Sequence, residues 1–216
     1  MSSTSAQSPR HRRFTPAAVL AGAVGSVALA ASMTGTLSAF TASINNTVNT
    51  AAAGTLIMQE QNATGSVTCN STDLGTISTN AATCATINKY GGSTTMVPGV
   101  PINTTISIKN TGTIAANTFT LTPTACTQTN NGTPNGSAID FCTQLSVIIK
   151  SGTTTIFSGT AAGLATAGLV TLPAAISPVA PGTTVPITFT TTLAPTAGNT
   201  YQGLGASQGL TWTFTS

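Results

Sequence analysis

Four cysteines, at positions 69, 84, 126 and 142, carry the clearest chemistry in this chain of 216 residues. If the chain is exported, as its first 39 residues indicate, an even number of cysteines is typical of disulfides, and three pairings are open. The local pairs, Cys69 with Cys84 and Cys126 with Cys142, close their loops at the least entropic cost, so we expect these two. Each bridge should stabilise the fold by about 3 kcal/mol, because it restricts the unfolded chain.

The chain after residue 39 holds no familiar catalytic or metal-binding constellation. Its one histidine, His11, precedes that point, and neither Cys-x-x-Cys nor His-Glu-x-x-His occurs. Glu60, Asp73 and Asp140 lie in three separate turn-rich regions, where we expect solvated side chains rather than an acid–base pair. A Ser–Lys pair stays open on sequence grounds alone, but no motif supports it. We therefore expect no catalytic residue, no metal, no cofactor and no enzymatic activity.

The charge balance argues against a nucleic-acid partner. Charged residues make up only 4% of the chain, against about 25% in an ordinary soluble domain. Three arginines, Arg10, Arg12 and Arg13, precede the first apolar run, and beyond them three lysines balance three carboxylates. Phosphate binding requires clustered Lys and Arg, which this neutral region lacks. A net charge near zero instead favours self-association.

The N-terminus has the order of residues expected of a secretion signal. A basic region, Met1–Phe14, precedes an apolar run over Ala17–Ala31. That run suits a signal peptide better than a transmembrane helix, which needs about 20 residues. We expect a signal peptidase to remove residues 1–39 by cutting between Ala39 and Phe40, although Leu37 is not the small residue of an Ala-x-Ala site. Contact with a membrane is then expected only through the uncleaved signal, the alternative being a permanent anchor.

Beyond residue 54, short alternating patterns between turn residues predict strands. Over Pro101–Asn110, isoleucines and Thr104 alternate with polar residues, and a hairpin is predicted around Ser151-Gly152. A long strand follows Pro181-Gly182, and Pro186 on its outward face predicts a sheet edge at that point. The predicted inward residues are Ile102, Thr104, Ile106, Ile108, Phe119, Leu121, Leu145, Val147, Ile149, Val185, Ile187, Phe189, Thr191, Leu193, Leu210, Trp212 and Phe214.

These patterns predict an all-β fold. They amount to eight to ten strands at intervals of roughly ten residues, the spacing of a two-sheet β-sandwich. Ala161–Gly168 is the one short helix expected after the signal. No low-complexity linker interrupts the chain after the cut, so we expect one domain over residues 40–216.

Three stretches resemble one protein family. The junction Ala39–Met58 reads Ala-Phe, a polar spacer ending in Asn-Thr, then Ala-Ala-Gly-Thr-Leu. This resembles the TasA/camelysin family of secreted bacterial proteins, which a SipW-type signal peptidase releases. The block from Pro98 to Leu121 and the final Trp-x-Phe strand are similar to the family as well. The resemblance implies a jelly-roll-like sandwich and assembly into extracellular fibres, a biofilm matrix or a cell-surface layer.

The first mature residues have the pattern of an assembly strand. Phe40, Ala42 and Ile44 alternate with polar residues, and an Asn-, Thr- and Ala-rich spacer follows up to residue 53. We expect residues 40–53 to form a flexible arm that adds as a strand to another subunit. The alternative is that the arm pairs with its own sheet as an ordinary first strand.

Two further functions stay open. A face presenting Thr188, Thr190 and Thr192 would suit a surface-binding module for carbohydrate or ice, but ordinary threonines on the solvated side of a strand are the favoured interpretation. Sugar binding also usually requires more exposed aromatic rings than this chain offers. Camelysin-like proteins also carry a peptidase label, which the missing ligands make the least favoured reading.

Overall fold

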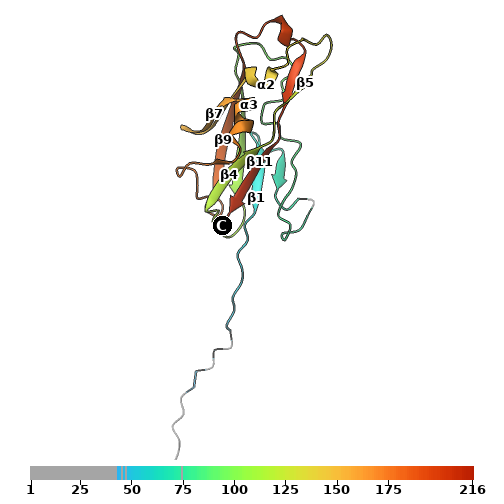
Figure 1. The fold of residues 1–216 in the computed structure, drawn as a ribbon. Coiled ribbons are helices and arrows are strands. Elements are labelled where there is room, and N and C mark those ends of the chain that lie inside the picture. Colours follow the sequence, from blue (N-terminus) through green and yellow to red (C-terminus); the bar gives the residue numbers. More distant parts are fainter. Residues whose placement is uncertain (1–42, 45, 47, 74) are drawn as a thin grey trace, which may run out of the picture. The chain divides into compact units, whose positions relative to one another are not determined.

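The computed structural model describes residues 43–44, 46, 48–73 and 75–216 (Figure 1). The expected signal peptide, its cut site, Phe40 and Ala42 lie outside the described residues. The chain divides into two units, Met1–Ala51 and Ala52–Ser216. The second unit contains every strand named below.

A six-stranded antiparallel sheet forms the larger layer. Its central strands, β3 and β9, are the two longest alternating patterns of the sequence, and they pair with Ile106 opposite Ile187. Each turns one apolar face inward, since side chains alternate along a strand. In spatial order the sheet contains β2 (Thr68–Asn70), β1 (Met58–Asn62), β3 (Ile102–Asn110), β9 (Thr184–Leu193), β6 (Leu145–Ser151) and β7 (Thr154–Thr160).

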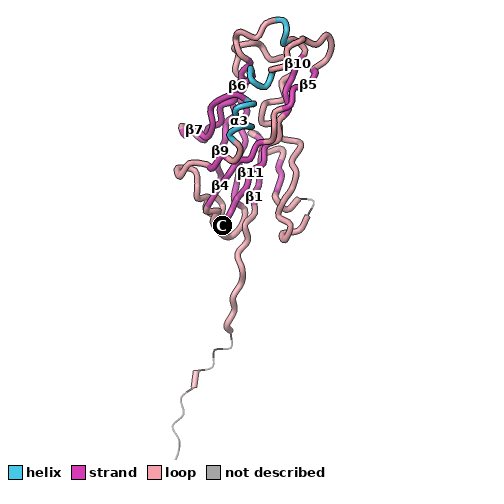
Figure 2. The backbone as a smooth tube through the Cα atoms, in the orientation of Figure 1, coloured by secondary structure: helices cyan, strands magenta, loops and turns pink. Residues whose placement is uncertain are grey.

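The opposing layer is smaller. It has three antiparallel strands in the order β11 (Leu210–Thr215), β4 (Thr118–Pro123) and β8 (Val170–Thr171), and a separate ribbon pairs β10 (Leu204–Ser207) with β5 (Thr127–Asn130). Three short helices, α2 (Phe141–Gln144), α3 (Ala161–Ala167) and the 3-10 turn η1 (Asn199–Tyr201), join the strands (Figure 2). The expected all-β sandwich is therefore confirmed.

The core lies between the two sheets. Phe119 of β4 packs edge-on against Phe214 of β11, with ring centroids 4.8 Å apart. Phe189 of β9 approaches Trp212 of β11 at 6.3 Å, which joins the two layers. The alternation read from the sequence is confirmed along the strands, because many of the residues predicted to face inward are fully buried. They include Ile106, Ile108, Phe119, Leu121, Val147, Ile149, Ile187 and Phe189.

Local elements follow from local chemistry. The β6–β7 hairpin turns at Gly152, whose φ of 55° favours glycine. Helix α3 begins at Thr160, whose hydroxyl accepts a hydrogen bond from the Gly163 N–H, and ends at Gly168 with φ 64°. Both the hairpin and this helix confirm the sequence predictions.

The position of Pro186 explains how a proline fits into an interior strand. Strand β9 pairs with β3 along its length, but its pairing with β6 ends at Thr188. Pro186 therefore lies where β9 has only one neighbour, so no second ladder needs the missing N–H. The prediction of a local sheet edge at Pro186 is confirmed.

The first strand begins later than expected. The pattern after Gly54 predicts a strand from Thr55, whereas β1 begins at Met58. Residues 55–57 are instead held by the turn after β3, where Thr113 N–H donates to Thr55 O and Thr111 N–H donates to Ile57 O. These bonds continue the antiparallel register in which Met58 lies opposite Asn110, beyond the ends of β1 and β3.

Candidate functional site

The two layers of the sandwich are unequal, and β11 is one of the strands that lie at the edge of a sheet. Strand β11 ends the three-stranded sheet and pairs only with β4 among the described residues. An open edge presents unpaired main-chain groups, which makes it a template for another strand.

The alternation of hydrogen-bonded pairs between β4 and β11 shows which main-chain groups of β11 face the open edge. Leu172 N–H donates to Phe119 O, so the main chain of Phe119 is directed toward β8 and away from β11. Because hydrogen-bonded pairs alternate in an antiparallel ladder, Phe119 opposite Phe214 is a non-bonded pair. By the same alternation, the N–H and C=O groups of Leu210, Trp212 and Phe214 point to the open side.

A cavity of about 1200 Å³ lies beside this edge. Residues 209–214 line it from the second sheet, and Met58 and Glu60 line it from the inner face of β1. Further walls come from residues 80–98, which lead from β2 to β3, and from residues 197–208, which include β10. The cavity therefore adjoins the side of β11 that has no neighbouring strand among the described residues.

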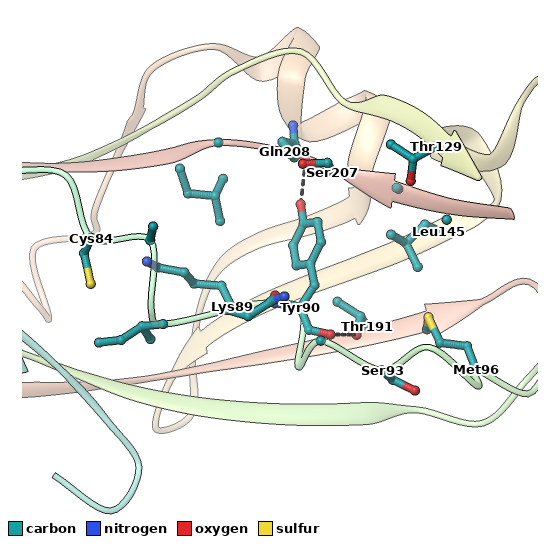
Figure 3. Close-up of a pocket in the computed structure, with 18 of the residues that line it drawn as sticks. Cys84, Lys89, Tyr90, Ser93, Met96, Thr129, Leu145, Thr191, Ser207 and Gln208 are labelled. Atoms are coloured by element: carbon teal, nitrogen blue, oxygen red, sulfur yellow. Dashed lines mark hydrogen bonds between the residues drawn. The ribbon is translucent and has the colours of Figure 1, made fainter. Parts of the chain in front are cut away.

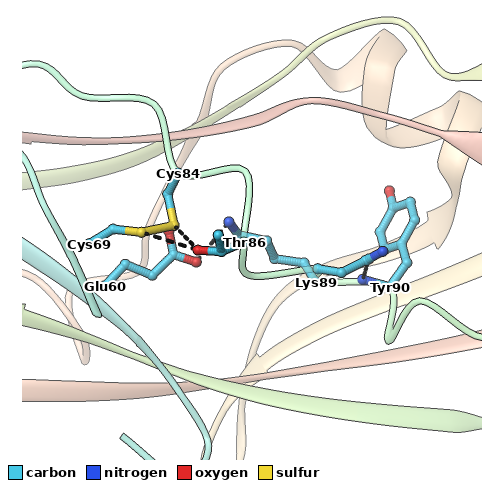
Figure 4. Close-up of polar contacts among 7 residues, drawn as sticks. Glu60, Cys69, Cys84, Thr86, Lys89 and Tyr90 are labelled. Carbon is cyan, nitrogen blue, oxygen red and sulfur yellow. Dashed lines mark hydrogen bonds and ion pairs between the residues drawn. A yellow bond between two sulfur atoms is a disulfide. The ribbon is translucent and has the colours of Figure 1, made fainter. Parts of the chain in front are cut away.

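The connecting segment, defined here as residues 81–101, forms no helix or strand. It is attached to the six-stranded sheet at several points, two of which involve β2 and β1 (Figure 4). Cys84 forms a disulfide with Cys69 of β2, and the Lys89 ammonium lies 2.7 Å from Glu60 Oε1 on β1. This wall of the cavity is therefore held in place by a disulfide and an ion pair, although the segment that forms it contains no helix or strand.

Glu60 corrects one prediction. The sequence places it in a solvated loop, but it lies in the middle of β1 and is only 8% exposed. It sits opposite Ile108, whose side chain is fully buried, so the alternation of the sheet turns Glu60 to the inner face. The charge of Lys89 compensates for the burial, since a buried carboxylate is stable only when paired.

The other two carboxylates lie in turns, as expected. Asp73 is exposed and accepts a hydrogen bond from the Asn70 N–H. Asp140 accepts one from the Tyr201 hydroxyl at 2.8 Å, and this bond holds the pKa of Asp140 below its ordinary value. Each carboxylate has a different partner, and the described residues contain no group of three or more potential metal ligands.

Tyr90 crosses the cavity from the connecting segment (Figure 3). Its hydroxyl donates to Gln208 Oε1, in the link between β10 and β11. Gln208 is held in turn, because its amide donates to Thr124 O at 2.8 Å and to Ala161 O at 3.1 Å. Burial raises the pKa of Tyr90 well above its ordinary value, so its hydroxyl stays protonated as a donor.

One buried donor in the cavity wall lacks an acceptor. Trp212 is 9% exposed, and its indole N–H has no hydrogen-bond partner within the described part of the chain. Leaving a buried donor unpaired typically costs about 1–3 kcal/mol. The side chain of Trp212 and its main chain on the open edge therefore both have unused hydrogen-bonding capacity in the same place. No sequence signal distinguishes this tryptophan from an ordinary core residue.

The remaining predicted site residues are distributed over the molecule. The disulfides join Cys69 to Cys84 and Cys126 to Cys142, in agreement with the expected local pairing. Of the proposed assembly strand only Ile44 is described, and it is 99% exposed.

The threonine face is partly occupied by contacts of its own. The Thr188 hydroxyl pairs with that of Thr105, and the Thr190 hydroxyl donates to Asn103. Two of the three hydroxyls proposed for surface binding are therefore engaged within the sheet.

Comparison with known proteins found no match that bears on the function of this chain. The chain matches no protein-family model, and no curated protein matches it. Among the described residues, no helix combines the length and apolar composition needed to cross a membrane.

Proposed function

We propose that this protein is a non-enzymatic, secreted structural subunit of an extracellular fibre, biofilm matrix or cell-surface layer. In this proposal the N-terminal arm of one subunit adds as a strand to β11 of the next. The observation that carries the proposal is the open edge of β11 beside a cavity of about 1200 Å³. Strand addition uses main-chain hydrogen bonds for affinity and alternate side chains for register.

The arm has the length and pattern that this edge requires. Strand β11 has six residues, and the apolar alternation from Phe40 to Ile44 spans five. Both correspond to roughly 15–20 Å of extended chain. An added strand next to β11 would turn alternate side chains toward the inner face of β1 and supply main-chain acceptors near the unpaired Trp212 indole.

Assembly of this kind yields a filament. The donating arm and the accepting edge are different surfaces of one chain, so the contact is heterologous and repeats without closing unless the rotation forms a ring. The resemblance to the TasA/camelysin family supports the same conclusion. Removal of the signal would free the arm at Phe40, which makes processing a condition for assembly.

A deletion of residues 40–49 that keeps a cleavable signal tests the proposal. The variant should fold and be secreted but remain monomeric by light scattering and negative-stain microscopy. A matched control changes the polar face of the arm, Thr41→Ser with Ser43→Thr, and should still assemble. Filaments formed by the deletion variant at the normal rate would refute strand addition by the arm.

The alternative functions have their own assays. A polysaccharide pull-down and an ice-recrystallisation assay examine the threonine face, and casein hydrolysis with and without a chelator examines peptidase activity. A positive result in any of them, from protein that does not form filaments, would favour that alternative over a structural subunit.

A further inference from the structure

We propose that Tyr90 is a positioning residue that limits the strand-accepting edge to β11 and so sets the register of the incoming arm. This inference rests on the proposed strand addition. It concerns where the added strand stops, which strand addition by itself does not determine.

The accepting edge is longer than β11 alone. Strand β10 pairs only with β5 among the described residues, and only Gln208 and Gly209 separate β10 from β11. Residues 203–207 line the same cavity as residues 209–214. An incoming strand therefore meets two open edges in succession, and slipping by two residues keeps the same side chains facing inward.

Tyr90 separates these two edges. Its ring extends from the connecting segment to Gln208, the residue between β10 and β11 (Figure 3). Lys89 and Cys84 lie on one side of the ring, and Met96, Leu145 and Thr129 lie on the other (Figure 3). The cavity is thus divided into a part beside β11 and a part beside β10.

The Tyr90 residue is held at both ends, by its side-chain hydroxyl and by its main chain. At its outer end the Tyr90 hydroxyl bonds to Gln208, whose amide is anchored on Thr124 O and Ala161 O. At its base the Tyr90 carbonyl accepts from the Thr191 hydroxyl at 3.4 Å, and the preceding residue, Lys89, is paired with Glu60. A side chain fixed in this way acts as a stop, because moving it breaks contacts at both ends.

The part beside β11 then matches the arm. Its edge has six residues, and the apolar alternation of the arm has five, so no slip of two residues fits before the chain reaches Tyr90. Without Tyr90, the arm would be free to continue along β10. Tyr90 therefore excludes the registers in which the added strand would extend from β11 onto β10.

Hydrogen exchange of the full mature protein, before and after filament assembly, tests this inference. In the wild type, assembly should protect Leu210–Thr215 and leave the exchange of Leu204–Ser207 unchanged. In Tyr90→Ala, protection should extend over Leu204–Ser207, with exchange there slowed at least tenfold. Tyr90→Phe keeps the ring but removes its bond to Gln208, so the protection of Leu204–Ser207 should lie between that of the wild type and that of Tyr90→Ala. Tyr201→Phe, which removes another phenol hydroxyl from the cavity wall, is the matched control and should leave the wild-type pattern unchanged.

Three outcomes would overturn the inference. Wild-type filaments that already protect Leu204–Ser207 would show that Tyr90 is not a stop, as would a Tyr90→Ala pattern identical to the wild type. If Tyr90→Ala fails to assemble, Tyr90→Leu is used in its place, because leucine is too short to reach Gln208. A wild-type exchange pattern in Tyr90→Leu filaments would count equally against the inference. Filaments with no protection anywhere along β11 would instead refute strand addition itself.

Discussion

The Lys89 ammonium lies 2.7 Å from Glu60 Oε1, and the two side chains are only 11% and 10% exposed. This pair joins the connecting segment to β1, and both residues line the cavity. Because both charges are withdrawn from water, each depends on the other for compensation.

Breaking this ion pair should destabilise the fold strongly. Lys89→Met leaves the Glu60 carboxylate buried and uncompensated, so we expect the free energy of unfolding to fall by about 3–5 kcal/mol. Urea denaturation measures the loss. The double variant Lys89→Met with Glu60→Leu should recover much of it, and Lys150→Met, at an exposed lysine, should change little. A single variant as stable as the wild type would contradict the buried pairing.

The Tyr201→Phe variant should lose less of its free energy of unfolding than the wild type as the pH falls into the acid range. The Tyr201 hydroxyl holds the pKa of Asp140 below its unfolded value, so this bond stabilises the fold above the unfolded pKa of about 4 and loses its effect as pH falls through the lower, folded pKa. The stability difference between wild type and Tyr201→Phe should therefore be largest near neutral pH and disappear in strong acid. Urea denaturation of both proteins from neutral to strongly acid pH measures this difference, and an NMR titration of Asp140 measures its pKa in each. A difference that persists in strong acid would assign the effect to packing.

The disulfides should map as two local bridges. Non-reducing peptide mapping of secreted protein should recover Cys69 linked to Cys84 and Cys126 linked to Cys142. Removing the second bridge with paired Cys→Ser changes should cost about 3 kcal/mol of stability in the entropic model. A peptide joining Cys69 to Cys126 would contradict both the structure and the sequence prediction.

Processing should produce a mature chain that begins at Phe40 or within a few residues of it. The reason is the order of basic, apolar and small residues over positions 10–39. N-terminal sequencing of extracellular material measures the cut directly. Material that retains Met1 would rule out a cleaved signal.

Tryptophan fluorescence should report assembly. Trp212 is the only tryptophan of the chain, it lines the cavity, and its indole N–H is unpaired. Occupation of the cavity by an arm changes the polarity around the indole, so the emission maximum should shift as filaments form. The variant lacking residues 40–49 should show no shift at the same concentration. An unchanged spectrum in filaments would place the added strand elsewhere.

Much of the fold could be read from the sequence because strand alternation is a local property. Ile102–Ile108 and Val185–Leu193 show their inward faces residue by residue, and the hairpin at Gly152 and the helix ending at Gly168 depend on neighbouring residues alone. Short pieces such as β2, β5, β8 and β10 escaped notice, because two to four residues are too few to display a period. Glu60 was misplaced for a related reason: Met58–Asn62 is polar on both faces and does not alternate.

What the sequence determined by itself was the set of side chains that face inward, the neutral surface and the local disulfides. What only the tertiary structure decided was which strands are neighbours, and hence which edge is left open. Strand order depends on contacts between residues far apart in the chain, such as Tyr90 and Gln208, separated by 118 positions. No local pattern encodes such a contact, because its energy exists only once both layers have closed around the core.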